Sequence, residues 1–202
     1  MNLNIVPIEY DKRGLEEIVR IIHDAFPDFF DKFILKNPPD KSVYETFLNE
    51  ISDNKSLYFL NKDLINLLDI YEKPVIGITS YLSVRNIDTH AKYQGTIGAS
   101  SERGSCFVSI HSPPLCNCDG ASRRIGIKCI HELGHMFGLE HHTNCKEIPE
   151  RNSICPMEIG HRIFREQKKI SLADYFDARM TEFCDECYKH LKNLPQPINQ
   201  FF

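Results

Sequence analysis

The sequence predicts a mixed α/β fold, of the α+β kind, in which a mixed sheet is flanked by helices. Up to residue 120, segments rich in β-branched and aromatic residues alternate with segments whose apolar residues follow the helical period. The chain has 202 residues, of which 42% are hydrophobic and 26% charged, as is ordinary for a globular protein. This length allows one sizeable core, or two small lobes that share a cleft.

The first part of the chain alternates between the two periods. Leu3 to Ile8 is a short apolar segment that predicts a strand, and the apolar residues of 12–26 follow helical spacing. Residues 43–51 carry a second helical stripe. Residues 56–60 then predict a strand, and residues 62–71 predict a short apolar helix.

Further strands and a final helix complete the expected elements. The strand candidates are residues 74–84, 95–99 and 106–111. An exposed edge at 95–100 is the best candidate for holding a peptide through main-chain hydrogen bonds. Residues 142–170 are polar and lack periodicity, which predicts an irregular segment. A capping box at Ser171 begins a last helix whose apolar face runs to Leu191, before Pro195 stops it.

Composition and charge exclude several classes of partner. The net charge is -4 and the pI is about 6.1, whereas nucleic acid or an anionic membrane would call for a basic face. The N-terminus lacks signal-peptide features, and no stretch approaches the roughly 18 apolar residues that span a bilayer. We therefore expect a cytoplasmic protein that binds neither nucleic acid nor membrane. Its eight cysteines stay reduced in that compartment, and clustered cysteines there are typical metal ligands.

Residues 131–141 read HELGHMFGLEH and predict a catalytic metal site. His131 and His135 stand four residues apart, so on a helix both can point at the same ion. Gly138 lies where a left-handed residue ends a helix at low cost, and the chain can then return His141 as a third ligand. Three neutral imidazoles leave the fourth zinc position open to water. In a chain of this composition, the probability that the pattern arises by accident is about one in ten thousand.

Glu132 follows the first of these histidines and is expected to be the general base, not a ligand. In the expected reaction, zinc polarises the scissile carbonyl and lowers the pKa of its water. Glu132 takes the proton of that water and then delivers it to the leaving amine. The alternative interpretation is a helix whose histidines lie at the surface by coincidence.

The motif, with a methionine downstream, resembles the signature of the metzincin clan of metallopeptidases, and within the clan it resembles the archaemetzincin family. That family adds cysteines after the third histidine. The matching residues here are Cys145, Cys155-Pro156-Met157 and Cys184-Asp185-Glu186-Cys187. The resemblance is strongest over residues 129–190. In the family the first cysteine directly follows the third histidine, whereas here His142 stands in that place and Cys145 comes three places later.

The resemblance implies one compact, two-lobed metallopeptidase domain. Its upper lobe would cover about residues 1–141 and its lower lobe about 142–192, with a short tail at 193–202. A substrate would lie in a horizontal cleft, antiparallel to the edge strand of the sheet. Met157 would be the Met-turn residue, packed under the zinc histidines without bonding the metal. A second, structural zinc is also implied, with the ligands Cys145, Cys155, Cys184 and Cys187.

Zinc chemistry independently favours a four-cysteine site, because closed zinc sites prefer four tetrahedral thiolates. Cys184 and Cys187 lie one helical turn apart and can face the same ion. The alternatives are free thiols or a different set of cysteines, with Cys116 and Cys118 as the competing pair in a loop. We therefore expect two zinc ions per chain, one catalytic and one structural.

Several other residues have less specific interpretations. Cys106 and Cys129 fall in an expected strand and helix and are predicted to be buried. His142 is expected to be a surface neighbour of the site, because His141 already fills the third ligand place. His161 is either a wall of the substrate pocket or an exposed loop residue, and His111 is expected to be structural.

Three functions are compatible with these motifs. The leading interpretation is a zinc metallopeptidase, endopeptidase or aminopeptidase-like, which acts as a monomer on peptide or protein substrates. The second is a catalytically silent zinc-binding interaction protein that retains the same fold. Glu132 argues against this alternative, because a purely structural site has no use for a carboxylate beside an open position. The third is hydrolysis of a non-peptide amide by the same chemistry.

Overall fold

A five-stranded sheet forms the centre of the molecule. The computed structural model describes residues 1–11, 14–50, 57–84, 95–111, 120–142, 154–158 and 172–194. The strand order is β2-β1-β5-β9-β8, and the pairs of β1 with β2, β1 with β5 and β5 with β9 are parallel. The strands are β1 (Asn2–Ile8), β2 (Lys32–Leu35), β5 (Val75–Thr79), β9 (Ser105–Ser109) and β8 (Gly98–Ser100). Only β8 runs antiparallel to its neighbour, and it ends the sheet at one edge within the described ranges.

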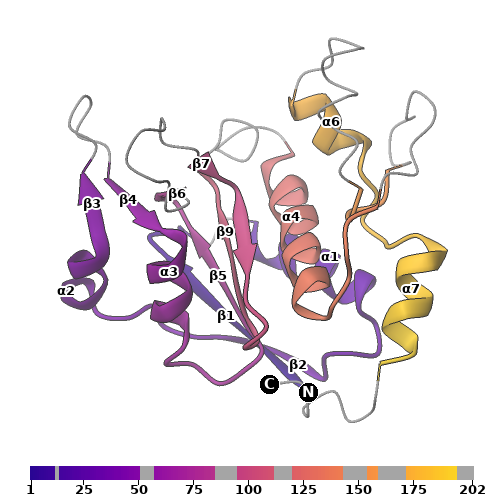
Figure 1. Ribbon diagram of the computed structural model, residues 1–202, viewed down its shortest axis with the longest axis horizontal. Helices are drawn as coiled ribbons and strands as arrows, with labels where there is room; N and C mark the ends of the chain where they lie inside the picture. The colour runs from indigo at the N-terminus through magenta and orange to yellow at the C-terminus, as the bar shows by residue number, and fades with distance from the viewer. Residues whose placement is uncertain are drawn as a thin grey trace.

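Successive side chains along the strands of this sheet belong to two separate hydrophobic clusters. Ile76 and Ile78 face the first cluster, together with helices α1 (Leu15–Ala25) and α4 (Ala121–Met136). Val75 faces the second cluster, together with helix α3 (Asn61–Leu68). Because successive residues of a strand point to opposite faces, the sheet is covered on both sides. Figure 1 shows the layers, with α3 on one side of the sheet and α1 and α4 on the other.

A smaller, four-stranded sheet lies beside β5 and β9. Its order is β3-β4-β6-β7, with only β4 and β6 parallel. The strands are β3 (Leu48–Glu50), β4 (Leu57–Leu60), β6 (Leu82–Val84) and β7 (Gly95–Thr96). The segments expected as single strands at 74–84 and 95–99 are therefore each divided between the two sheets. No proline or glycine pair marks the division in residues 75–84, so their composition does not predict it.

The helix expected over residues 43–51 is only partly present. Helix α2 (Lys41–Tyr44) and the 3-10 turn η1 (Glu45–Phe47) are followed by strand β3, which begins at Leu48. Pairing with β4, in which Leu48 opposes Phe59, outweighs the helical spacing of these residues. Strand β2 was not expected from the sequence.

The expected final helix is two helices, α6 (Leu172–Ala178) and α7 (Asp185–Lys192). The break follows main-chain pairing with Ile154, which donates to Ala178 O at 3.1 Å and accepts from Met180 N at 2.7 Å. Cys184 is extended, with φ -65° and ψ 164°, and precedes α7. A continuous helix was therefore a wrong prediction, because the interrupted backbone is used to bind residues 154–158.

Helices α6 and α7 contribute to the first hydrophobic cluster through Phe176 and Leu191. The ring of Phe26, just after α1, contacts those of Phe137 and Phe183 at centroid distances of 5.6 and 5.1 Å. These contacts tie α1, the end of α4 and the approach to α7 into one core. No helix among the described segments is long and apolar enough to cross a membrane.

Candidate metal centres and active site

The first candidate site lies on helix α4, which packs against α1 and against strands β8 and β9. Both faces of its C-terminal half are covered, so that His131 is 5% exposed and Glu132 is 3% exposed. His135 is half-buried and His141 is exposed. The site therefore has a buried floor on α4 and opens to solvent on the side of His141.

The Nε2 atoms of three imidazoles converge on one point. Nε2 of His135 lies 3.2 Å from that of His131 and 2.9 Å from that of His141, and the His131–His141 distance is 3.3 Å. Two nitrogens bound tetrahedrally to one zinc lie about 3.3 Å apart, given Zn–N distances of about 2.0–2.1 Å. The spacing of the three rings therefore fits a zinc ion.

Main-chain carbonyls fix two of these rings. Nδ1 of His131 lies 2.7 Å from Pro156 O, and Nδ1 of His135 lies 2.9 Å from Leu139 O. A carbonyl oxygen can only accept, so Nδ1 carries the proton and Nε2 keeps its lone pair for a metal. Burial lowers the pKa of His131 well below its usual range, which keeps this imidazole neutral.

The turn that returns His141 depends on Gly138, as the sequence predicts. Helix α4 ends at Met136, and Gly138 has φ +80° in the left-handed region. Its N–H donates to His135 O, and the N–H of Leu139 donates to Gly134 O, both at 2.9 Å. These bonds satisfy the last carbonyls of the helix while the chain reverses toward His141.

Glu132 forms a buried ion pair with Lys128, which sequence reasoning missed. Lys128 Nζ lies 2.5 Å from Glu132 Oε1, and burial lowers the pKa of the lysine. The four-residue spacing on one helix was a usable signal for this pair. Oε1 also lies 3.9 Å from Nε2 of His131, which is the ring nitrogen that faces the other two imidazoles.

Strand β8 passes directly beside this carboxylate. A Cβ atom at Gly98 would lie 2.7 Å from Glu132 Oε1. Strand β8 is therefore the second half of the edge strand expected at 95–100. It runs next to the point where the three Nε2 atoms converge. Strand β8 is at the edge of the five-stranded sheet within the described residues.

Residues 154–158 form the floor of the site. A Cβ at Gly134, in α4, would lie 2.7 Å from the sulfur of Met157, so the methionine packs against the helix between its two histidines. Met157 is fully buried. Arg179 donates to Pro156 O at 3.0 Å and to Glu158 O at 2.9 Å. This buried arginine, which the sequence did not single out, holds the floor in place.

A second cluster contains three of the four cysteines expected to bind a structural zinc. Cys155, Cys184 and Cys187 offer their sulfurs together with a ring nitrogen of His142, and these ligand atoms all lie within 4.8 Å of one another. Cys145 lies outside the described residues. The side chain of His142 is 17% exposed, which differs from the surface position expected for it.

The other expectations have mixed outcomes. Cys106 and Cys129 are fully buried, as predicted. His111 follows the end of β9 and is exposed. Cys116, Cys118 and His161 lie outside the described residues.

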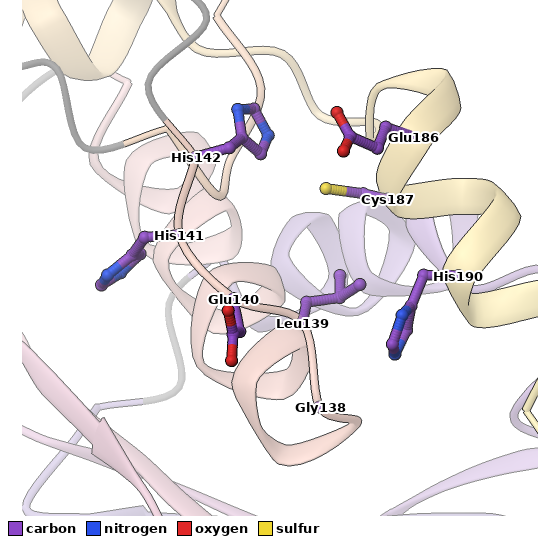
Figure 2. A pocket seen from close by; sticks show the side chains of 8 residues that line it. All are labelled: Gly138, Leu139, Glu140, His141, His142, Glu186, Cys187 and His190. Atoms are coloured by element: carbon purple, nitrogen blue, oxygen red, sulfur yellow. The ribbon is translucent and has the colours of Figure 1, made fainter.

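A pocket of about 400 Å³ lies between residues 138–142 and α7. Figure 2 shows its lining, in which His141 points away from α7 while His142 points toward Cys187. The lining includes neither Glu132 nor the other two histidines of the first cluster. This pocket therefore shares only His141 with the three-histidine cluster.

The chain has the fold of zinc metallopeptidases of known structure. More narrowly, it has the fold of archaemetzincins. It is similar to archaemetzincin from Methanopyrus kandleri, with a TM-score of 0.64, 20% identity and coverage of 95% of this chain and 93% of that one. For archaemetzincin from Archaeoglobus fulgidus, the TM-score is 0.57 at 17% identity, over 94% of this chain and 99% of that one.

A zinc-dependent peptidase from Methanocorpusculum labreanum is a third similar structure. Its TM-score is 0.53 at 15% identity, again over 94% of this chain and 99% of that one. No protein-family model and no curated protein sequence matches the chain. The fold class predicted from the sequence is thus confirmed by structural similarity, at identities of 15–20%.

Replacing Gly138 by alanine tests the turn that returns His141. The left-handed backbone should make Gly138→Ala cost roughly 1–2 kcal/mol of stability and weaken zinc binding by the three histidines. Gly120→Ala is the matched control, because Gly120 has φ +78° at the other end of α4 and a Cβ there would meet nothing within 4 Å. Thermal unfolding and zinc competition with a chelator measure both effects. Equal zinc affinity in the two variants would contradict the role of the turn.

Replacing Lys128 by alanine tests whether the ion pair positions Glu132. We expect kcat to fall about 10- to 100-fold with little change in KM, because the carboxylate loses the group that orients it. Lys73→Ala is the control, since Lys73 forms a half-buried pair with Asp69 at 3.0 Å away from the site. That variant should lose stability only. Faster turnover of Lys128→Ala would show instead that the ammonium group opposes the action of the carboxylate.

Proposed function

We propose that this protein is a zinc-dependent peptidase whose zinc is held by His131, His135 and His141. The observation that carries the proposal is the convergence of three Nε2 atoms within 3.3 Å of one another beside a buried carboxylate. Three neutral imidazoles around one point leave room for a further zinc ligand, which a closed structural site would not. Similarity to a structure described as a zinc-dependent peptidase supports the same conclusion.

Zinc, when bound, would supply Lewis acidity and lower the pKa of a coordinated water. The chain's own contribution is to hold the rings in one tautomer through Pro156 O and Leu139 O, so that no reorganisation is needed on binding. Met157 adds an apolar floor that keeps bulk water away from the underside of the rings.

Glu132 is the general base of the proposed reaction. Its Oε1 lies 3.9 Å from Nε2 of His131, within reach of a water held among the imidazoles. The carboxylate accepts a proton from that water as it attacks, and then donates the proton to the leaving amine. The ion pair with Lys128 holds the buried carboxylate in one orientation.

The substrate is proposed to bind as an added strand along β8. An extended peptide can pair with a sheet edge through main-chain hydrogen bonds, independent of its side chains. Since a Cβ at Gly98 would lie 2.7 Å from Glu132 Oε1, a peptide on this edge passes close to the base. The cleaved molecule is therefore an extended peptide or an unfolded protein segment, and both endopeptidase and aminopeptidase modes remain compatible with this arrangement.

We also propose a second, structural zinc at the cysteine cluster. Burial raises the pKa of Cys155 to about 11 and raises that of Cys187 as well, so a bound cation would have to displace the proton of each thiol. A metal there would tie α7 to residues 154–158, which also form the floor of the first site. We propose further that the protein is a cytoplasmic monomer that binds neither nucleic acid nor membrane.

A catalytically silent zinc protein is the second candidate, and one observation favours it. The ammonium group of Lys128, 2.5 Å from Glu132, neutralises the carboxylate and so opposes its action as a base. Such a protein would keep both metals for stability and bind peptides without cleaving them. Turnover measurements on the wild-type enzyme separate the two candidates directly.

Replacing Glu132 by glutamine tests the proposed reaction. We expect turnover of a fluorogenic peptide library to fall about 100- to 10,000-fold, because proton transfer is lost while shape is kept. Zinc at the three histidines should stay bound, as measured by elemental analysis. Glu140→Gln is the control, since Glu140 is exposed between His135 and His141. Unchanged turnover in Glu132→Gln would place the base elsewhere, and no turnover in the wild type would support the silent alternative.

A further inference from the structure

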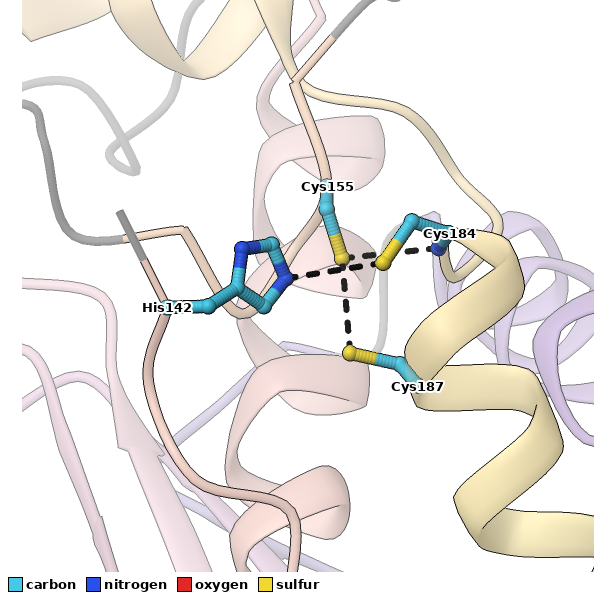
Figure 3. Close-up of side chains that lie close together, drawn as sticks. All are labelled: His142, Cys155, Cys184 and Cys187. Atoms are coloured by element: carbon cyan, nitrogen blue, oxygen red, sulfur yellow. Dashed lines mark hydrogen bonds between the residues drawn. The ribbon is translucent and has the colours of Figure 1, made fainter. Parts of the chain in front are cut away.

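Besides the three-histidine cluster, four candidate ligand atoms gather in a second cluster next to the chain segment that follows His141. They are the sulfurs of Cys155, Cys184 and Cys187 and Nε2 of His142, all within 4.8 Å of one another. Figure 3 shows that the three sulfurs and the imidazole point inward from three different segments. The main chain of Cys184 also donates to Cys155 Sγ at 3.5 Å, as amides do around thiolate sulfur.

The distances match one tetrahedral zinc with a mixed ligand set. With Zn–S of about 2.3 Å and Zn–N of about 2.0–2.1 Å, two sulfurs lie about 3.8 Å apart and a sulfur and a nitrogen about 3.6 Å apart. Here Cys155 Sγ and Cys187 Sγ are 3.9 Å apart, and Cys184 Sγ and His142 Nε2 are 3.5 Å apart. Hydrogen bonds would account for each of these distances singly, whereas one shared ion accounts for the convergence of all four ligand atoms within 4.8 Å.

The imidazole of His142 is held in the orientation that a zinc ligand needs. Its Nδ1 lies 3.2 Å from Oε2 of Glu158, whose side chain is 3% exposed. The main-chain N–H of His142 donates to Met157 O at 3.3 Å, and residues 142 and 158 form a parallel bridge. A carboxylate on Nδ1 fixes the proton there and turns the Nε2 lone pair toward the metal, as is usual for zinc-bound histidines.

We propose that His142 is the fourth ligand of the second zinc, which makes it a site of one histidine and three cysteines. This inference rests on the second zinc of the proposed function and replaces the expectation that Cys145 completes the set. A neutral imidazole with three thiolates gives the buried site one net negative charge, whereas four thiolates would give two. The lower charge is easier to bury, particularly beside the carboxylate of Glu158.

Cobalt substitution of the full chain tests the ligand set without relying on activity. Sulfur-to-cobalt charge-transfer absorption grows with the number of bound thiolates, and the three-histidine site contributes none because it contains no sulfur. The proposal predicts three cobalt-bound thiolates in the wild type. His142→Cys should then show four, so the wild-type intensity should be about three quarters of that of this variant.

Two single substitutions complete the test. Cys145→Ser should leave the charge-transfer intensity unchanged. His142→Ala should reduce cobalt binding from two equivalents to about one, or weaken the second equivalent at least about tenfold. His190→Ala is the matched histidine control, because His190 also faces the pocket beside Cys187 but belongs to neither cluster.

The possible outcomes separate this inference from the proposed function. A loss of about a quarter of the intensity in Cys145→Ser, with no change in His142→Ala, would overturn the assignment of His142. If His142→Ala does not fold, the His142→Cys and Cys145→Ser measurements still decide the ligand. An absence of sulfur bands in the wild type would remove the second zinc altogether, whereas the peptidase proposal stands or falls separately on Glu132→Gln.

Discussion

The carbonyl oxygen of Pro156 is the acceptor on which both sites depend. It lies 2.7 Å from Nδ1 of His131 and 3.0 Å from a guanidinium nitrogen of Arg179. The residue before it, Cys155, belongs to the cysteine cluster, and the residue after it, Met157, packs against α4. A buried oxygen that accepts two bonds fixes this segment, because it links the segment to α4 through His131 and to the residue after α6 through Arg179.

The three histidines of the first site are positioned in two different ways. The helix α4 sets His131 and His135 through its regular period and its packing against α1 and the sheet. The third imidazole depends on the turn at Gly138 and on the segment that follows it. Sites built on regular elements are positioned more precisely than sites on loops, so the position of His141 depends more on its turn than those of His131 and His135 do.

The local parts of the first site could be predicted from the sequence, because they depend on fixed helical spacing and on one glycine. His131, His135 and Gly138 lie as the HELGHMFGLEH segment indicates, and the sheet with flanking helices follows from the alternating periods. The ion pair of Lys128 was accessible through its spacing but was overlooked. The break between α6 and α7 was not accessible, because it depends on pairing with Ile154, far away in the sequence. The environment of His142 was missed for the same reason, since Glu158 and Cys184 approach it only in the folded chain.

His141 and His142 are consecutive, yet their side chains point to opposite sides of one short stretch of chain (Figure 2). A single peptide unit therefore connects the two candidate metal-binding clusters. Since neighbouring side chains alternate in direction here, one residue added between Leu139 and His141 would turn each imidazole toward the wrong partner set. The connection after Gly138 thus tolerates changes of side chain more readily than changes of length, even though it forms no helix and belongs to no sheet.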